Sequence, residues 1–291
     1  MKRCRKILVF VILLILVVAV VVGTSYCRFF LNNAEKVTST ISFNYPGLRI
    51  ETRNINVDEI RDNFPRIVCF GDSVTFGWNL KYSDSYPVLL ENLLLQDYPQ
   101  VRVINSGIGG NTILDACKRL NSDIFYYEPD VVIINFGLND GMLFEVDRNK
   151  SVAKESLLYD SGDGYYTPQV DLVTFYKCYN DVIEQIESRD IKLIIVGPNP
   201  VLDCFPLLED EEFRKKQREI YDLYNKKIIE IGESRGIICV NLWGIFVRED
   251  KIGDYMQEDC IHPNKSGLKL VADNIYSTLK LYNVLGQIET N

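Results

Sequence analysis

From Arg66 onward, short runs of Val and Ile alternate with longer stretches of helical periodicity, and this alternation constrains the fold more than any other feature. The runs are almost continuously apolar, which is typical of strands buried on both faces. Such strands need helices on both sides of one parallel sheet. The predicted strands are Ile67–Phe70, Val101–Asn105, Val131–Phe136, Lys192–Val196 and Ile237–Asn241.

Helical patterns separate these runs and complete the prediction of the fold class. Because parallel strands are joined by right-handed crossovers, the alternation predicts an α/β fold. We expect a three-layer α/β/α sandwich around a central five-stranded parallel sheet, in a flavodoxin-like arrangement. The predicted helices lie near residues 85–96, 112–122, 171–188, 209–234 and 265–282. Two stretches, 141–170 and 198–206, break the rhythm, and each follows the carboxyl end of a strand, where open α/β sheets bind ligands.

The N-terminus has the composition of a membrane signal anchor. Sixteen apolar residues run from Ile7 to Val22, and four basic residues precede them. A spanning helix needs about 17–25 residues, so a short transmembrane helix over 7–23 fits. The basic end, residues 1–6, is expected in the cytoplasm. Residues 24–64 form a juxtamembrane stalk and residues 65–291 the exported domain. A cleaved signal peptide, giving a secreted protein, is the alternative, although small residues before a cleavage site are scarce.

Charge and rare residues exclude several classes of function. The net charge of -8 argues against a nucleic-acid partner. Only one histidine, His262, is present, so a site with several histidine ligands is impossible. The eight cysteines include no Cys-x-x-Cys pair, which removes support for a zinc ribbon or a thioredoxin-type site. Export permits disulfides, but the wide spacings favour buried free thiols in the exported domain.

Polar residues that suit ester hydrolysis follow the ends of the predicted strands. Gly71-Asp72-Ser73-Val74 follows the first strand, and a glycine-rich stretch that contains Gly110 follows the second. Gly137-Leu138-Asn139-Asp140 follows the third, and Asp259-Cys260-Ile261-His262 precedes the last helix. A serine nucleophile needs a base, an orienting carboxylate and N–H donors for the oxyanion, and all of these residue types occur here.

These four blocks, in this order, resemble the SGNH/GDSL hydrolase family over about residues 66–282. The resemblance implies a GDSL-type esterase or lipase that needs no cofactor and no metal. By matched position, Ser73 is the nucleophile, His262 the base and Asp259 the carboxylate that orients it. The backbone N–H groups of Ser73 and Gly110, with the Asn139 side chain, are implied as the oxyanion hole. Val74 is a conservative departure from the more frequent Leu or Ile, and Asp72 and Asp140 are interpreted as turn-stabilising.

We therefore expect a serine hydrolase tethered to the cell membrane, with its catalytic domain outside the cytoplasm. Its substrate is a carboxylic ester of a small molecule, glycan or lipid, with O-acetyl groups as one candidate. An acyltransferase would use the same triad, and a non-catalytic binding domain on the hydrolase fold is a further alternative. A nucleotide-binding or redox protein is disfavoured, because the glycine-rich stretch follows the wrong strand and has Thr112 at the third glycine position.

Overall fold

A computed structural model describes residues 42–45, 48–51, 64–146, 159–160, 165–203 and 211–286. The predicted anchor, residues 7–23, and most of the predicted stalk lie outside these residues. Within the described part of the chain, no helix is long and apolar enough to cross a membrane. Two short strands of the stalk, β1 (Ser42–Tyr45) and β2 (Leu48–Glu51), pair with each other in a sheet of their own.

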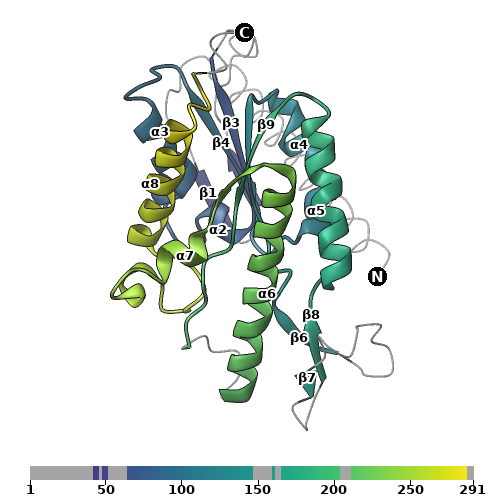
Figure 1. The fold of residues 1–291 in the computed structure, drawn as a ribbon. Helices are drawn as coiled ribbons and strands as arrows, with labels where there is room; N and C mark the ends of the chain where they lie inside the picture. Colours follow the sequence, from purple (N-terminus) through teal and green to yellow (C-terminus); the bar gives the residue numbers. More distant parts are fainter. Residues whose placement is uncertain are drawn as a thin grey trace, which may run out of the picture. The chain divides into compact units, whose positions relative to one another are not determined.

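The central sheet has five parallel strands in the order β10-β9-β5-β3-β4 (Figure 1). Each strand coincides with a predicted one to within one or two residues, which confirms the predicted sheet. Numbered from one to five along the chain, the strands lie in the order 2-1-3-4-5, the flavodoxin-like order, whose direction reverses beside the first strand. The strands are β3 (Arg66–Gly71), β4 (Arg102–Gly107), β5 (Val131–Asn135), β9 (Lys192–Val196) and β10 (Ile238–Val240).

Helices cover both faces of the sheet and give the three predicted layers (Figure 1). Along β3, Ile67 and Cys69 face one core, whereas Val68 and Phe70 face the other, as the two-residue period of a strand requires. The first core is closed by α3 (Tyr86–Leu94), α7 (Leu242–Phe246) and α8 (Lys265–Leu281). The second is closed by α4 (Ile113–Asp123), α5 (Leu172–Glu187) and α6 (Glu211–Arg235).

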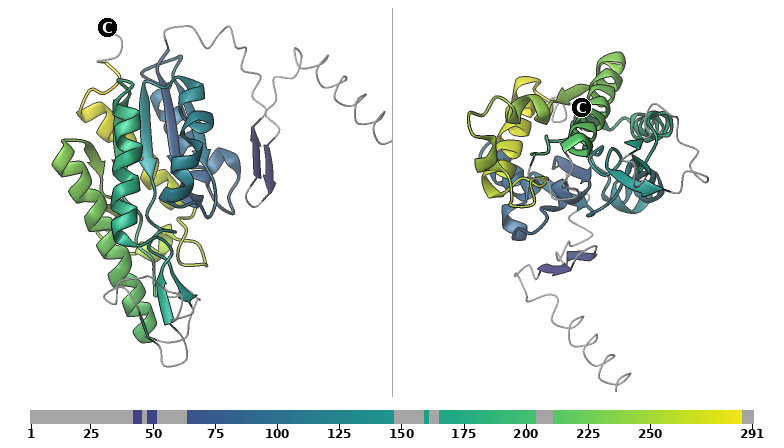
Figure 2. Two further views of the ribbon diagram at one scale, coloured as in Figure 1. Left: turned by 90° about the vertical axis from the view of Figure 1, so that its right-hand side faces the viewer. Right: turned by 90° about the horizontal axis from the view of Figure 1, so that it is seen from below.

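A small antiparallel sheet occupies part of the first irregular stretch, and the sequence did not predict it. It consists of β6 (Leu143–Val146), β8 (Tyr165–Pro168) and β7 (Tyr159–Asp160). Figure 2 shows it beside the first turns of α6. Gln217 of α6 fastens it by accepting from the Leu143 N–H at 2.7 Å and donating to the Gly141 carbonyl at 2.9 Å. The ring of Phe213 adds an edge contact with Tyr166.

The cysteines follow the expectation at some positions and contradict it at one. Cys69, Cys117, Cys178 and Cys239 are free thiols, although only Cys69 is fully buried. Cys260, in contrast, is disulfide-bonded, so the prediction of a free thiol is wrong there. The physical reason is that Cys260 lies in a loop next to a second chain segment: the Leu202 N–H donates to the Cys260 carbonyl at 2.9 Å. Cys260 is itself buried, so the neighbouring chain segment at Leu202, and not exposure, distinguishes it from the free thiols.

Candidate active site

Ser73 is held rigidly where β3 ends and the single turn α2 (Ser73–Phe76) begins. Asp72 caps this turn, since its carboxylate accepts the Val74 N–H at 2.9 Å. The turn packs directly on the end of β4 because residue 107 is glycine. A Cβ at Gly107 would lie 2.2 Å from the Phe76 nitrogen, closer than any real side chain allows. The nucleophile candidate is therefore placed by backbone packing and not by a mobile loop.

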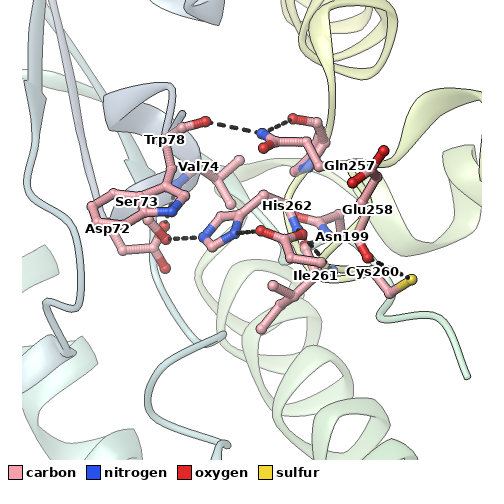
Figure 3. Close-up of polar contacts among 12 residues, drawn as sticks. Asp72, Ser73, Val74, Trp78, Asn199, Gln257, Glu258, Cys260, Ile261 and His262 are labelled. Carbon is pink, nitrogen blue, oxygen red and sulfur yellow. Dashed lines mark hydrogen bonds and ion pairs between the residues drawn. The ribbon is translucent and has the colours of Figure 1, made fainter. Parts of the chain in front are cut away.

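The loop before α8 brings His262 to this serine (Figure 3), and Asp259 of the same loop reaches the other side of the imidazole. His262 Nε2 lies 2.8 Å from Ser73 Oγ, and His262 Nδ1 lies 2.7 Å from Asp259 Oδ2. The other oxygen of Asp259 accepts the backbone N–H groups of Ile261 at 3.1 Å and His262 at 2.9 Å. Because Asp259 can accept only if Nδ1 carries a proton, the pair selects the tautomer whose Nε2 faces Ser73 as an acceptor.

The carboxyl of Asp259 remains ionised despite its partial burial. Burial opposes its negative charge, but hydrogen bonds from the His262 backbone, the His262 ring and the Ile261 backbone outweigh that effect. The pKa of Asp259 therefore lies below the ordinary value for an aspartate. A permanent carboxylate behind the imidazole stabilises the imidazolium that forms when the ring takes a proton.

Three side chains that the sequence did not single out hold the histidine loop in place. Gln257 Nε2 donates to the carbonyls of Trp78 and Pro263, each at 2.9 Å, and links this loop to the nucleophile turn (Figure 3). Asn199 Nδ2, at the end of β9, donates to the Ile261 carbonyl at 2.9 Å. Asn264 caps α8 by accepting from Ser266 and Gly267. No local motif marks the contacts of Gln257 with Trp78 and of Asn199 with Ile261, because these partners are 179 and 62 residues apart in the sequence.

Two backbone donors next to Ser73 are available for an oxyanion. Within the part of the chain that the structure describes, neither the Ser73 N–H nor the Gly110 N–H donates to a protein acceptor. Gly110 adopts a φ of +77°, and a Cβ there would meet nothing within 4 Å, so the backbone is open to an approaching molecule. N–H groups without a protein acceptor can donate to a developing negative charge, which is what an oxyanion hole requires.

Asn139, the third predicted donor, comes from the turn after β5. Its Nδ2 donates to the carbonyl of Asn111, the residue after Gly110, at 3.0 Å, and to Asp72 Oδ2 at 3.4 Å. The structure thus gathers all five predicted site residues at the carboxyl edge of the sheet, from the ends of β3, β4 and β5 and from the loop before α8. This edge is next to the point where the strand order reverses.

A pair of buried acids lies behind the nucleophile. Asp72 is 1% exposed and Asp140 is 0% exposed. Burial raises the pKa of Asp72 to about 7, against the Val74 hydrogen bond and the charge of Arg119. Burial also raises the pKa of Asp140 to about 7; the Ile113 N–H opposes this rise and the negative charge of Asp72 adds to it. Both residues do stabilise turns as the sequence suggested, since Asp140 accepts the first N–H of α4 at 2.9 Å.

The ring of Trp78 packs against the histidine and against the glycine-rich stretch after β4. The Trp78 ring is stacked on the His262 ring, with centroids 6.0 Å apart and 28° between the planes. It also lies against Gly109, where a Cβ would come within 3.2 Å of the indole.

Among the described residues, no group of three or more His, Cys, Asp or Glu side chains could hold a metal ion.

The chain is similar to known proteins over most of its length. The model of the GDSL-like Lipase/Acylhydrolase family matches residues 69–270. An arylesterase from Vibrio mimicus is 30% identical over 131 residues, which are 43% of this chain and 64% of that protein. An acetylxylan esterase from Xylanibacter ruminicola is 25% identical over 231 residues, 74% of this chain. The chain spans less than two thirds of both relatives, and only 43% of the second.

A solved structure supports the fold. The lipase/acylhydrolase from Enterococcus faecalis superposes with a TM-score of 0.58 and 24% identity. The match covers 75% of this chain and 96% of the other. The three-layer architecture with a five-stranded parallel sheet is therefore the fold of that hydrolase.

Proposed function

Because the chain belongs to the GDSL-like lipase/acylhydrolase family, we propose that it is a serine hydrolase that cleaves carboxylic esters with Ser73, His262 and Asp259. One observation carries this proposal: the two hydrogen bonds that join the hydroxyl, the imidazole and the carboxylate in series, at 2.8 and 2.7 Å. A turn serine without a catalytic role would have no reason to face the only histidine of the chain. Both bonds lie within the range in which proton transfer is efficient.

The first half of the reaction acylates the serine. As Ser73 Oγ attacks the ester carbonyl carbon, its proton passes to His262 Nε2, and the imidazolium is stabilised by Asp259. The carbonyl oxygen becomes an oxyanion, which the N–H groups of Ser73 and Gly110 and the Asn139 amide stabilise. The intermediate then expels the alcohol, which takes the proton from His262 Nε2 and leaves an acyl-serine.

The second half repeats these steps with water. His262 Nε2 accepts a proton from a water molecule as its oxygen attacks the acyl-serine carbonyl. The second tetrahedral intermediate uses the same donors, and Ser73 Oγ leaves with the proton from His262. The products are a carboxylic acid, an alcohol and the free enzyme, so no cofactor is consumed.

The proposed substrates are small acyl esters, O-acetyl groups of a glycan in particular. The acetylxylan esterase among the relatives supports this choice. We further propose that residues 7–23 tether the protein to the membrane and that the catalytic domain lies outside the cytoplasm. The 16-residue apolar run after four basic residues supports this proposal. Membrane fractionation with high-salt washing tests it, because an apolar anchor resists salt, whereas soluble protein starting near residue 24–28 would contradict it.

The esterase proposal is tested with the full chain and the Ser73→Ala variant. We expect wild-type protein to hydrolyse p-nitrophenyl acetate and acetylated xylo-oligosaccharides, and Ser73→Ala to lose roughly 10⁶-fold in kcat, as in other triad enzymes. A serine-directed phosphonate should label Ser73 in the wild type and leave the variant unlabelled. Full activity in Ser73→Ala would overturn the mechanism. Product analysis with an added sugar acceptor separates hydrolysis from acyl transfer, because only a transferase forms the new ester.

A further inference from the structure

Asp72 lies between the nucleophile and the third oxyanion donor, and its two carboxylate oxygens have different partners. Oδ1 accepts the Val74 N–H at 2.9 Å and caps the nucleophile turn. Oδ2 faces Asn139 Nδ2 at 3.4 Å. With 1% exposure, the carboxylate has almost no contact with solvent that could replace either partner. A single side chain therefore joins the turn that carries Ser73 to the turn that carries Asn139.

The Asn139 amide has a donor end and an acceptor end, and its surroundings distinguish them. Its nitrogen has two acceptors, Asp72 Oδ2 and, at 3.0 Å, the Asn111 carbonyl. A flipped amide would place Asn139 Oδ1 against these two oxygens and would lose both hydrogen bonds. Only the orientation with nitrogen toward Asp72 is compatible with both partners. In this orientation an N–H group of Asn139 faces Asp72, the residue that precedes Ser73.

The two hydrogen bonds of this nitrogen differ in length. The bond to Asn111 is of ordinary length, whereas the 3.4 Å contact with Asp72 is at the long limit of hydrogen bonding. The hydrogen directed at Asp72 is therefore weakly bound, so an oxyanion that forms at Ser73 can compete for it. The bond to the Asn111 carbonyl engages the other hydrogen of the amide, so Asp72 decides where the remaining hydrogen points.

From this arrangement we propose that Asp72 is a positioning residue of the oxyanion hole: it orients the Asn139 amide so that its nitrogen serves the oxyanion formed at Ser73. The inference rests on the proposed function, since it assigns Asp72 to the same reaction. Asp72 acts through Asn139 and does not touch the substrate. Its contribution should therefore vanish when the Asn139 amide is absent.

The test is a double-mutant cycle with Asp72→Asn, Asp72→Ala and Asn139→Ala. Asparagine at 72 keeps the cap on Val74 with its oxygen and turns an NH₂ group toward the Asn139 nitrogen, so that two donors face each other. The Asp72→Ala variant removes the acceptor altogether. It therefore remains informative if the asparagine of Asp72→Asn flips and presents its oxygen to Asn139. We expect each Asp72 variant, like Asn139→Ala, to lower kcat roughly 10²–10³-fold with KM nearly unchanged. In the Asn139→Ala background, neither Asp72 substitution should lower kcat further.

Asp171→Asn is the matched control, because Asp171 caps α5 through the same kind of bonds, to Val173 and Thr174. It should leave kcat unchanged. A normal kcat for Asp72→Ala, or a loss that persists undiminished in the Asn139→Ala background, would overturn the inference and leave the esterase proposal intact. Those results would reduce Asp72 to a helix cap.

A readout without activity separates failure of the inference from failure of the proposed function. The side-chain NH₂ signals of Asn139 in an NMR spectrum, assigned by their loss in Asn139→Ala, report the hydrogen bonds of that amide. We expect Asp72→Ala to shift these signals and speed their exchange with water, and Asp171→Asn to leave them in place. Unchanged signals in Asp72→Ala would contradict the inference even if the wild type hydrolysed no ester and Ser73 resisted phosphonate labelling.

Discussion

Two acidic regions flank the Ser73–His262 pair, and they differ in how they accommodate a carboxyl group. In the histidine loop, Asp259 has a side chain that is 30% exposed and receives two backbone N–H groups as well as the imidazole. Behind the nucleophile, Asp72 and Asp140 are almost completely buried. One oxygen of Asp140 has no hydrogen-bond partner within the described residues. The pKa is lowered at Asp259 and raised to about 7 at Asp72 and Asp140.

The difference shows that hydrogen-bond donors and neighbouring charges, together with burial, decide the charge of a carboxyl group here. Asp259 accepts three hydrogen bonds and is only partly buried. Asp72 and Asp140 each accept fewer hydrogen bonds, are almost fully buried, and repel each other when both are ionised. The two kinds of pKa shift therefore change the stability of the fold with pH in opposite directions. A lowered folded-state pKa stabilises the fold above the unfolded pKa, and this stabilisation is lost as the pH falls through the folded value. A raised folded-state pKa favours the fold below the unfolded pKa, and this advantage is lost as the pH rises through about 7.

The strongest test of the comparison removes the charge of Asp259. In Asp259→Asn, the amide can present its NH₂ group to Nδ1 and favour the wrong imidazole tautomer. We expect kcat to fall up to about 10⁴-fold, as in other triads. Steady-state kinetics on full-length protein measure this, and Asp254→Asn, an exposed position in the short helix Ile252–Tyr255 just before this loop, is the control. A loss smaller than tenfold would show that the charge of Asp259 is not required.

An intermediate effect is expected in the buried pair. Asp140→Asn keeps an oxygen for the Ile113 N–H and removes a charge that costs stability at high pH. Between about pH 4 and 7 the wild type should lose stability as Asp140 ionises, on the order of 1–3 kcal/mol, and Asp140→Asn should lose less, because only Asp72 of the pair still ionises there. Thermal melts at pH 5 and pH 8 measure the difference, with Asp273→Asn, whose side chain is 40% exposed, as control. Equal pH dependence in the wild type and the variant would refute the raised pKa.

The smallest expected effect concerns the link between the two regions. Gln257→Ala removes the hydrogen bonds to the Trp78 and Pro263 carbonyls and loosens the histidine loop relative to the nucleophile turn. We expect kcat/KM to fall roughly three- to tenfold, which corresponds to about 1 kcal/mol. Gln185→Ala, whose amide donates only within α5, should leave kcat/KM unchanged. A loss of activity as large as that of Asp259→Asn would mean that Gln257 touches the reacting groups.

The sheet and its helices were predictable because their pattern is periodic and their strands are buried on both faces. All five strands and the five long helices agree with the structure to within about two residues. The sheet of β6, β7 and β8 was missed, because its strands are short and lack a repeated pattern of buried positions. It is stabilised by Gln217 and Phe213 of α6, which are about 45–75 residues away along the chain from their partners.

The candidate site was predictable where its residues follow strand ends in short blocks. Ser73, Gly110, Asn139, Asp259 and His262 all lie at one edge, and parallel strands bring their carboxyl ends together by topology. Asn199, Gln257 and Trp78 were missed, since an asparagine, a glutamine and a tryptophan outside the blocks have no distinguishing pattern. Their roles exist only through partners such as the Ile261 carbonyl and the His262 ring.

The sequence by itself determined the layer architecture, the order of the blocks and the chemistry that one serine and one histidine make available. Hydrophobic periodicity and residue type are local properties, and they can be read without knowing which segments meet. Only the tertiary structure decided the charge of each aspartate and the orientation of the Asn139 amide. These depend on burial and on donors from distant segments, so Asp72 and Asp259 look alike in the sequence and differ in the fold.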